Sequence, residues 1–244
     1  MIVSIHQPNY LPWVGFFDKI KRSDVFVLFD DVQFPRGKKH FGHRNKIKTN
    51  AGEKWLSVPI KNKSDLVPFN KTIINYETDW RQQHCNLIKE FYKKSKYFLD
   101  YYEKISNIIM EKHNSLTDLS AELIVYFMKE LEINTELQYS SDLVDDVSGG
   151  EKIFKILEEL NATDYVTGSG PGSMRYINED DFKSKGINLH WQFYEHPKYE
   201  QLYGDFIPYL SVIDLLFNYG DKRIGPSTSV VPIDQVKDFN VEDY

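Results

Sequence analysis

The spacing of apolar residues predicts an alternation of short strands and helices. A first apolar run is followed by helically spaced apolar residues between Trp13 and Ile20, and then by a second apolar run. Such an opening, within about thirty residues, predicts two parallel strands joined by a crossover helix. The runs that we expect to form strands are Ile2–Ile5, Val25–Phe29, Trp55–Ile60, Thr72–Asn75, Leu137–Tyr139, Tyr165–Thr167 and Asn188–Phe193.

Helical periodicity dominates the middle of the chain. Three successive apolar stripes between residues 79 and 131 predict three helices. A Ser-x-x-Glu capping box predicts a helix from Ser148 to Leu160, and Leu210–Tyr219 predicts a last helix before a polar tail. The pattern indicates an α/β fold in which a parallel or mixed sheet carries flanking helices. We expect one domain over residues 1–244, with a helical lobe at about 79–131 inserted in it or appended to it.

Composition excludes several classes of protein. The chain has 244 residues, of which 41% are hydrophobic and 15% aromatic, which is enough apolar mass to form a core. The single cysteine, Cys85, excludes a disulfide framework and a cysteine-based metal cluster, and we expect it to have no catalytic role. No apolar run approaches the ~20 residues that span a bilayer, and no signal-type segment precedes the first strand. The expectation is a cytoplasmic protein without membrane insertion.

Charge is distributed unevenly along the chain. The formal net charge of −6 argues against a general nucleic-acid-binding protein. Residues 35–50 nevertheless hold six basic side chains and no acidic one, and we expect a loop that binds phosphate groups of a small ligand through Arg44 and Lys46. The alternative is an ordinary solvated surface. The six basic residues are Arg36, Lys38, Lys39, Arg44, Lys46 and Lys48.

Candidate catalytic residues lie where the first two expected strands end. His6 follows the first strand, and Asp30 and Asp31 follow the second. Ligands of open parallel sheets bind beyond the carboxyl ends of the strands, and only one of two adjacent aspartates can face His6. A histidine oriented by a carboxylate is a suitable general base. We therefore predict His6, Asp30 and Asp31 as catalytic residues, with backbone capping as the alternative role.

Further residues near these strand ends are candidate ligand contacts. The turn after His6 leads into a helix start, which favours an anion. The Gly168-Ser169-Gly170 turn follows a strand but lacks the complete P-loop and dinucleotide fingerprints. His40 and His43 have no third ligand fixed on a strand or helix, so no metal site is expected. The predicted substrate-binding residues are Gln7, Asn9, Tyr10, Trp13, Gln33, Phe34, His43, Arg44, Asn45, Lys46, Gly168, Ser169, Gly170 and Tyr176.

Several of these segments resemble the WbqC-like family of bacterial proteins. The most specific block is residues 5–20, IHQPNYLPWVGFFDKI. His43 departs from the family pattern, which commonly has asparagine before the Arg-Asn pair. The resemblance spans nearly the whole chain, and it continues in DDVQF at 30–34, RNKI at 44–47, WLSVP at 55–59, Tyr165 with Gly168, and SVIDLLFNYG at 211–220.

The resemblance implies an enzyme of O-antigen or other lipopolysaccharide biosynthesis that transfers a glycyl or other acyl group to the amine of a nucleotide-linked amino sugar. In this interpretation Arg44, Lys46 and the helix start at Trp13 hold the diphosphate, and His6 with one aspartate is the base. Tyr10, Trp13 and Phe34 would stack on the nucleobase or the sugar. The acyl donor stays open among a thioester, a charged tRNA and an ATP-activated carboxylate.

Two other functions stay open. The first is an ATP- and magnesium-dependent carboxylate–amine ligase, because the opening of the chain resembles nucleotidylyltransferase folds. Their paired histidines at the helix start are absent, since Pro12 and Trp13 stand there, and residues 227–229 are only a faint counterpart of their phosphate loop. The second is a non-catalytic sugar-nucleotide-binding protein in which His6 is structural.

Overall fold

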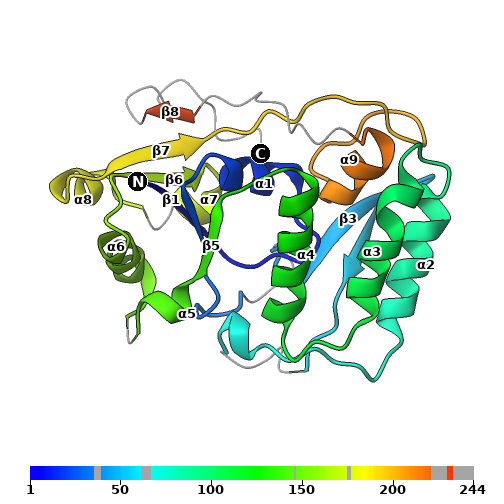
Figure 1. Ribbon diagram of the computed structural model, residues 1–244, viewed down its shortest axis with the longest axis horizontal. Helices are drawn as coiled ribbons and strands as arrows, with labels where there is room; N and C mark the ends of the chain where they lie inside the picture. The colour runs from blue at the N-terminus through cyan, green and yellow to red at the C-terminus, as the bar shows by residue number, and fades with distance from the viewer. Residues whose placement is uncertain (36–39, 62–66, 146, 175–176, 221–229, 233–244) are drawn as a thin grey trace.

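The computed structural model describes residues 1–35, 40–61, 67–145, 147–174, 177–220 and 230–232 (Figure 1). Within this part of the chain, six strands form one sheet in the order β5-β2-β1-β6-β7-β8. The first five are parallel, and β8 runs antiparallel to β7. The strands are β1 Ile2–His6, β2 Val25–Leu28, β5 Glu136–Tyr139, β6 Asp164–Gly168, β7 Asn188–Gln192 and β8 Val230–Pro232.

Helices flank this sheet, so the predicted α/β fold is confirmed. The first helix, α1, joins the parallel strands β1 and β2 as the sequence predicts. In the described ranges, no helix combines the length and apolar character that a bilayer crossing requires. The helices are α1 Val14–Lys21, α2 Trp80–Tyr92, α3 Phe98–Met110, α4 Leu116–Glu130, α5 Ser140–Leu143, α6 Gly149–Glu159, α7 Pro171–Met174, α8 Glu179–Ser184 and α9 Val212–Asn218, with a 3-10 turn η1 at Phe69–Lys71.

The two faces of the sheet are buried by different helices. On β2, Phe26 and Leu28 belong to one core with the aromatic residues of α1, whereas Val25 and Val27 belong to a second core with residues of α6 and α8. This alternation follows from the two-residue period of a strand. The first core continues into the helices α2, α3, α4 and α9, of which α2, α3 and α9 lie at the opposite end of the molecule from α6 and α8 (Figure 1).

The order of the parallel strands reverses at β1. From β1 the chain first builds outwards through β2 to β5, and then returns to place β6 and β7 on the other side of β1. In open α/β sheets, such a reversal leaves a crevice beyond the carboxyl ends of the two strands that flank it. Here those strands are β1, which ends at His6, and β6, which ends at Gly168.

A separate hairpin and three helices fill the interval between β2 and β5. Strands β3 Arg44–Thr49 and β4 Gly52–Ser57 pair in antiparallel register, and α2, α3 and α4 follow them. The hairpin corrects the expectation of a basic loop over residues 35–50. Asn45 and Ile47 are buried on one face of β3 while Arg44 and Lys46 are half-buried on the other, so the lysine-rich sequence still alternates as a strand does.

Three smaller sequence predictions were wrong. The expected strand at Thr72–Asn75 is reduced to one isolated bridge, between Ile74 and Ile60. Ser148 makes no capping hydrogen bond at the start of α6, where Gly149 adopts a φ of 65° outside helical geometry. The polar tail was expected to carry no element, yet residues 230–232 form β8.

Candidate active site at the carboxyl edge of the sheet

The strand reversal brings together residues from three strands. The β1–β6 register aligns Ser4 with Val166, so two residues further on His6 comes opposite Gly168 on the face that α1 covers. Gly168 is in turn aligned with Gln192 of β7, whose side-chain amide donates to the Gly15 carbonyl of α1 (3.0 Å). His6, Gly168 and Gln192 therefore form one row along the carboxyl edge.

His6 is half-buried and has a defined tautomer. Its Nδ1 lies 2.9 Å from the carbonyl oxygen of Gln7, which can only accept, so Nδ1 carries the proton and Nε2 is the free acceptor. Among the described residues Nε2 has no hydrogen-bond partner. Burial, and secondarily the charge of Lys19, lowers the pKa of His6 to about 3, so the ring is neutral at physiological pH. The edge of the ring packs against Phe16, with 5.1 Å between centroids.

Lys19 is a buried amine next to this histidine, and the sequence analysis did not find it. It is 3% exposed, and its Nζ has one long contact, 3.4 Å from the Ile5 carbonyl. Burial lowers the pKa of Lys19 to about 7. The available signal was its place in α1, since position 19 is three residues after Phe16 and therefore faces the sheet.

The glycines at the end of β6 face open space. A Cβ built at Gly168 or at Gly170 would meet no atom of the described residues within 4 Å, and neither glycine needs a positive φ. Neither backbone conformation nor packing among these residues therefore demands glycine here. Close approach of a ligand to the backbone is the remaining physical reason for it.

The start of α1, in contrast, is covered. The Trp13 indole folds back over Gly15, where a Cβ would come within 2.2 Å of the ring, and it packs against Tyr194 and Tyr209. The backbone of Trp13 also bridges to Ser211. This packing gives Trp13 a structural contact at the helix start where the anion was expected.

Asp30 does not orient His6. Its Oδ1 accepts from the Ser141 backbone N–H (3.1 Å), and its Oδ2 accepts from the Ser141 hydroxyl (2.8 Å) and from Asn70 (3.2 Å). The Ser140 hydroxyl lies 3.0 Å from Oδ1. The side chain is 3% exposed, so Asp30 ties the end of β2 to the start of α5.

Asp31, like Asp30, lies beyond the end of β2, and it forms an ion pair with the buried Lys152 of α6. It also accepts from the Ser140 hydroxyl (2.5 Å). Within the described residues neither aspartate hydrogen-bonds His6, and the Gln7 carbonyl orients the ring in their place. A catalytic role for either aspartate stays a prediction without a contact to support it.

Three predicted binding residues lie inside the protein. Tyr10 is fully buried and hydrogen-bonds Nδ1 of His84 (2.9 Å). Asn9 is 6% exposed. Asn45 is 1% exposed, and its amide donates to the carbonyl of Leu11 (2.6 Å), which has a positive φ of 47°. Tyr10 and Asn45 thus hold the turn after β1 against α2 and β3.

Phe34, His43 and Gln33 lie on the segment that links β2 to the hairpin. Phe34 is buried, and its ring packs against those of His43, His40 and Phe69. Gln33 is exposed, and its backbone bridges to Pro68. Gln33 is the member of this group that faces solvent.

Arg44 and Lys46 share one face of the hairpin with an exposed tryptophan. The Arg44 guanidinium lies 4.1 Å from the ring centroid of Trp55, which is 40% exposed. Lys46 pairs with Glu53 (2.6 Å) and lies 5.7 Å from the same ring. Phe41, 37% exposed, packs against Trp55 at 5.6 Å. The sequence analysis missed Trp55 and Phe41 as surface residues, because aromatics in a strand pattern are usually buried.

A buried ionic network connects β3 to α9, and it was also missed. Asp214 is fully buried and accepts from the hydroxyls of Tyr92 (2.7 Å) and Tyr199 (2.8 Å) and from the Gln201 amide (2.8 Å). Burial raises its pKa, against these hydrogen bonds. Lys48 of β3 donates to Gln201 (3.1 Å), so this member of the basic segment is an interior group.

Some predicted residues lie outside the described residues, namely Tyr176, Arg36, Lys38, Lys39 and residues 227–229. Cys85 is buried, and burial raises its pKa to about 11, so the thiol stays protonated at physiological pH. Ser169 follows β6, and its N–H donates to the carbonyl of Gln192 (3.3 Å). Gln7 is half-buried beside His6.

Comparison with known proteins places the chain in a family. The chain is 34% identical over 221 residues to an uncharacterized protein, Rv1507c, of Mycobacterium tuberculosis, an alignment that covers 89% of this chain and 94% of the relative. No solved structure matches. The WbqC-like protein family matches residues 7–225, which include the turn after β1, the hairpin, β6 and α9. The chain therefore belongs to the WbqC-like protein family.

Proposed function

We propose that this protein transfers a glycyl or other acyl group to the amine of a nucleotide-linked amino sugar, for a bacterial surface polysaccharide. One observation carries the proposal. His6 is a half-buried, neutral histidine whose Nε2 has no partner among the described residues, and it lies opposite Gly168, where the strand order reverses and no described atom fills the space. That combination suits a reaction in which a substrate nitrogen must lose a proton.

The reaction assigns each group one role. The sugar amine binds as the free base, with its N–H directed to Nε2 of His6. Its lone pair forms the C–N bond to the acyl carbon of a thioester or ester donor, and the bond to the sulfur or oxygen leaving group breaks with its electron pair. The proton from nitrogen passes to His6 and then to the leaving group. Because burial keeps His6 neutral, the amine meets an acceptor and not a second cation.

Lys19 acts in this proposal as a positioning residue. When it is protonated, its charge opposes protonation of His6. Its pKa of about 7 means that this opposition fades as the pH rises through neutrality. We therefore expect turnover to increase through pH 7 in the wild type, and Lys19→Met to flatten that part of the pH profile while ligand binding is retained.

The nucleotide part of the substrate binds on the exposed face of the β3–β4 hairpin in this proposal. Taken in chain order, the five parallel strands lie third, second, first, fourth and fifth across the sheet, an order used by nucleotide-binding folds. Trp55 and Phe41 offer exposed aromatic surface for a base, and Arg44 and Lys46 offer charge for the phosphates. We assign the nucleobase to Trp55, in place of the buried Tyr10.

Thermal shift and turnover together test the proposal. UDP- or dTDP-linked amino sugars should raise the melting temperature by mass action. His6→Gln should keep that shift and lose at least 100-fold in turnover, the usual contribution of a general base. His190→Gln, on β7 and paired with Asp164, is the matched control and should keep turnover. No stabilisation by any sugar nucleotide, or full turnover in His6→Gln, would contradict the proposal.

The strand order also favours a second function, an ATP-dependent carboxylate–amine ligase. The same panel separates the two. A melting shift with ATP and magnesium, and amide formation that requires ATP, support the ligase. Binding of sugar nucleotides without turnover under either condition supports a non-catalytic binding protein.

A further inference from the structure

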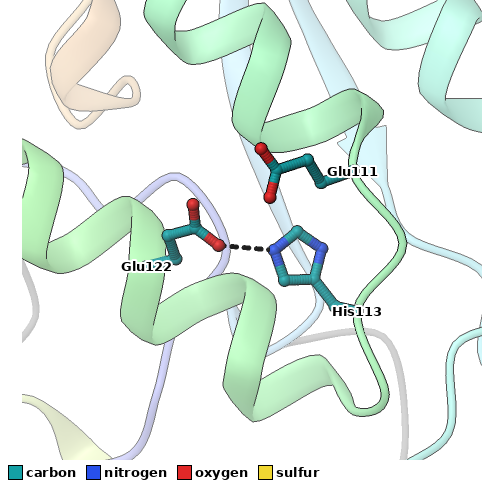
Figure 2. A group of neighbouring side chains, drawn as sticks. All are labelled: Glu111, His113 and Glu122. Carbon is teal, nitrogen blue, oxygen red and sulfur yellow. Dashed lines mark hydrogen bonds and ion pairs between the residues drawn. The ribbon is translucent and has the colours of Figure 1, made fainter.

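A histidine and two glutamates converge at the junction of α3 and α4, away from the sheet edge. Glu111 directly follows α3, His113 lies in the connection, and Glu122 is on α4. One ligand atom from each side chain lies within 4.8 Å of the others. Figure 2 shows both carboxylates turned towards the same imidazole nitrogen, and Nε2 of His113 lies 2.8 Å from Glu122.

The histidine at the centre is held rigidly. Its side chain is 7% exposed. The hydroxyl of Tyr76 accepts from the His113 backbone N–H and donates to its carbonyl, both at 3.0 Å. Arg81 donates to the carbonyl of Met110 (2.5 Å), and a capping box at Ser115 begins α4 directly after the connection. Nδ1 is buried, so Nε2 is the nitrogen that the protein presents.

No lysine or arginine of the described residues forms an ion pair with either carboxylate. Nε2 carries at most one proton, and Glu122 takes that hydrogen bond. Within the described residues, the Glu111 carboxylate has no hydrogen bond or ion pair. The nearby cations Arg81 and Lys112 lie over the ring of Tyr76, 5.1 and 5.9 Å from its centroid. Two carboxylate groups thus converge on one imidazole nitrogen, an arrangement that a bound dication would stabilise.

We propose that Glu111, His113 and Glu122 bind a transition-metal dication of the zinc class, independently of the proposed transferase site. An imidazole nitrogen with two carboxylate oxygens suits Zn²⁺ or Co²⁺ better than Mg²⁺, which prefers oxygen ligands alone. Ligand atoms of a tetrahedral zinc ion lie about 3.3 Å apart, so rotation of the two exposed glutamate side chains has to bring these atoms closer together to close the site. The metal joins the end of α3 to α4.

The metal affinity that we expect depends on Nδ1 of His113, the imidazole nitrogen that does not bind the metal. A metal on Nε2 leaves the proton on Nδ1, which has no acceptor within the described residues. Partners at that nitrogen usually contribute 10- to 100-fold to affinity, so we expect micromolar binding. Acidification weakens binding, because a proton competes with the metal for Nε2.

The test uses the full, tag-free chain, titrated with Zn²⁺ and with Co²⁺ in calorimetry, with the visible absorption of Co²⁺ as a second readout. We expect one site per chain, a melting temperature that rises with metal concentration, and no response to Mg²⁺ at the same concentration. Glu111→Gln and Glu122→Gln each should weaken binding at least tenfold. Both residues are exposed, so the variants should fold, and Glu103→Gln on the exposed face of α3 is the control.

Two results would overturn the proposal. One is no Zn²⁺ or Co²⁺ binding at concentrations of about 100 μM, far above a micromolar Kd. The other is binding that both glutamate variants retain, which would assign the metal to other histidines such as His40 and His43.

Discussion

The ends of β2 and of β1 lie side by side on one edge of the sheet, yet their polar side chains differ in how many hydrogen-bond partners they have. At the end of β2, four donor groups surround Asp30, and Asp31 pairs with a buried lysine. At the end of β1, His6 makes one side-chain hydrogen bond within the described part of the chain, and it lies opposite Gly168, where no described atom fills the space. The first arrangement stabilises the fold, and the second leaves an atom available for chemistry.

This difference shows that position at a carboxyl edge is not enough to identify a catalytic residue. Both strand ends satisfy the topological rule for ligand binding. What separates them is whether neighbouring elements use up the hydrogen-bonding capacity of the side chain. On β2 the start of α5 does so, because its serines lie directly against the carboxylate.

The largest effect should come from removing the Asp30 carboxylate at the end of β2. Asp30→Ala leaves several buried donors without an acceptor, and we expect a loss of about 3–5 kcal/mol in the free energy of unfolding. Urea denaturation measures it. Asp142→Ala, an exposed residue of α5, is the matched control and should change stability by no more than about 0.5 kcal/mol. Equal losses in both variants would contradict the structural role of Asp30.

The next largest effect should be a loss of stability at low pH that is caused by His84, a buried histidine of α2. Burial lowers the pKa of His84 to about 4, below its usual 6.5. Between these values the unfolded chain binds a proton that the folded chain does not, so stability falls as the pH drops from about 7 to 4. The loss attributable to His84 is about 3 kcal/mol, at 1.36 kcal/mol per pKa unit.

Unfolding free energies at several pH values, in the wild type and in His84→Gln, measure this contribution. The variant should lose part of the acid sensitivity. An identical pH dependence in the two proteins would show that His84 is not buried in the neutral form. His6 acts in the same direction, because its pKa is lowered too.

Adding a single methyl group should destabilise the protein at Gly15, at the start of α1, and not at Gly168, at the end of β6. Gly15→Ala places a Cβ against the Trp13 ring, and we expect a cost of about 1–3 kcal/mol from overpacking. Gly168→Ala meets open space and should change stability by less than about 0.5 kcal/mol, while it weakens binding of the sugar nucleotide. Combining Gly15→Ala with Trp13→Ala should remove most of the clash, and additive costs would argue against it.

The smallest change in stability should come from a substitution on the surface of the β3–β4 hairpin. The pair between Lys46 and Glu53 is partly exposed, so Lys46→Ala should cost at most about 1 kcal/mol. It should still weaken nucleotide binding, in a manner that depends on salt. Lys54→Ala, exposed on the same hairpin, is the control and should leave nucleotide affinity unchanged. If both variants bind equally well, Lys46 does not contact the phosphates.

Much of the fold could be predicted from the sequence alone. The parallel pair β1–β2 with its crossover helix, the three helices from α2 to α4, and the strands β5, β6 and β7 all follow from local periodicity. The β3 strand was not predicted, because the six basic residues of this segment indicated a loop. The alternation of Asn45 and Ile47 with Arg44 and Lys46 is the pattern of a strand. Local patterns report what each segment buries, and they say little about its partners.

The chain by itself determined which residues could do chemistry, and it placed His6 and Gly168 at strand ends. Only the tertiary structure decided which of them are free to do so. Asp30, Tyr10 and Asn45 are held by groups 34 to 111 positions away in the chain, at Ser141, His84 and Leu11. The same distant packing leaves Nε2 of His6 without a partner among the described residues. Hydrogen-bonding capacity is used up by neighbours in space, and sequence spacing does not encode those neighbours.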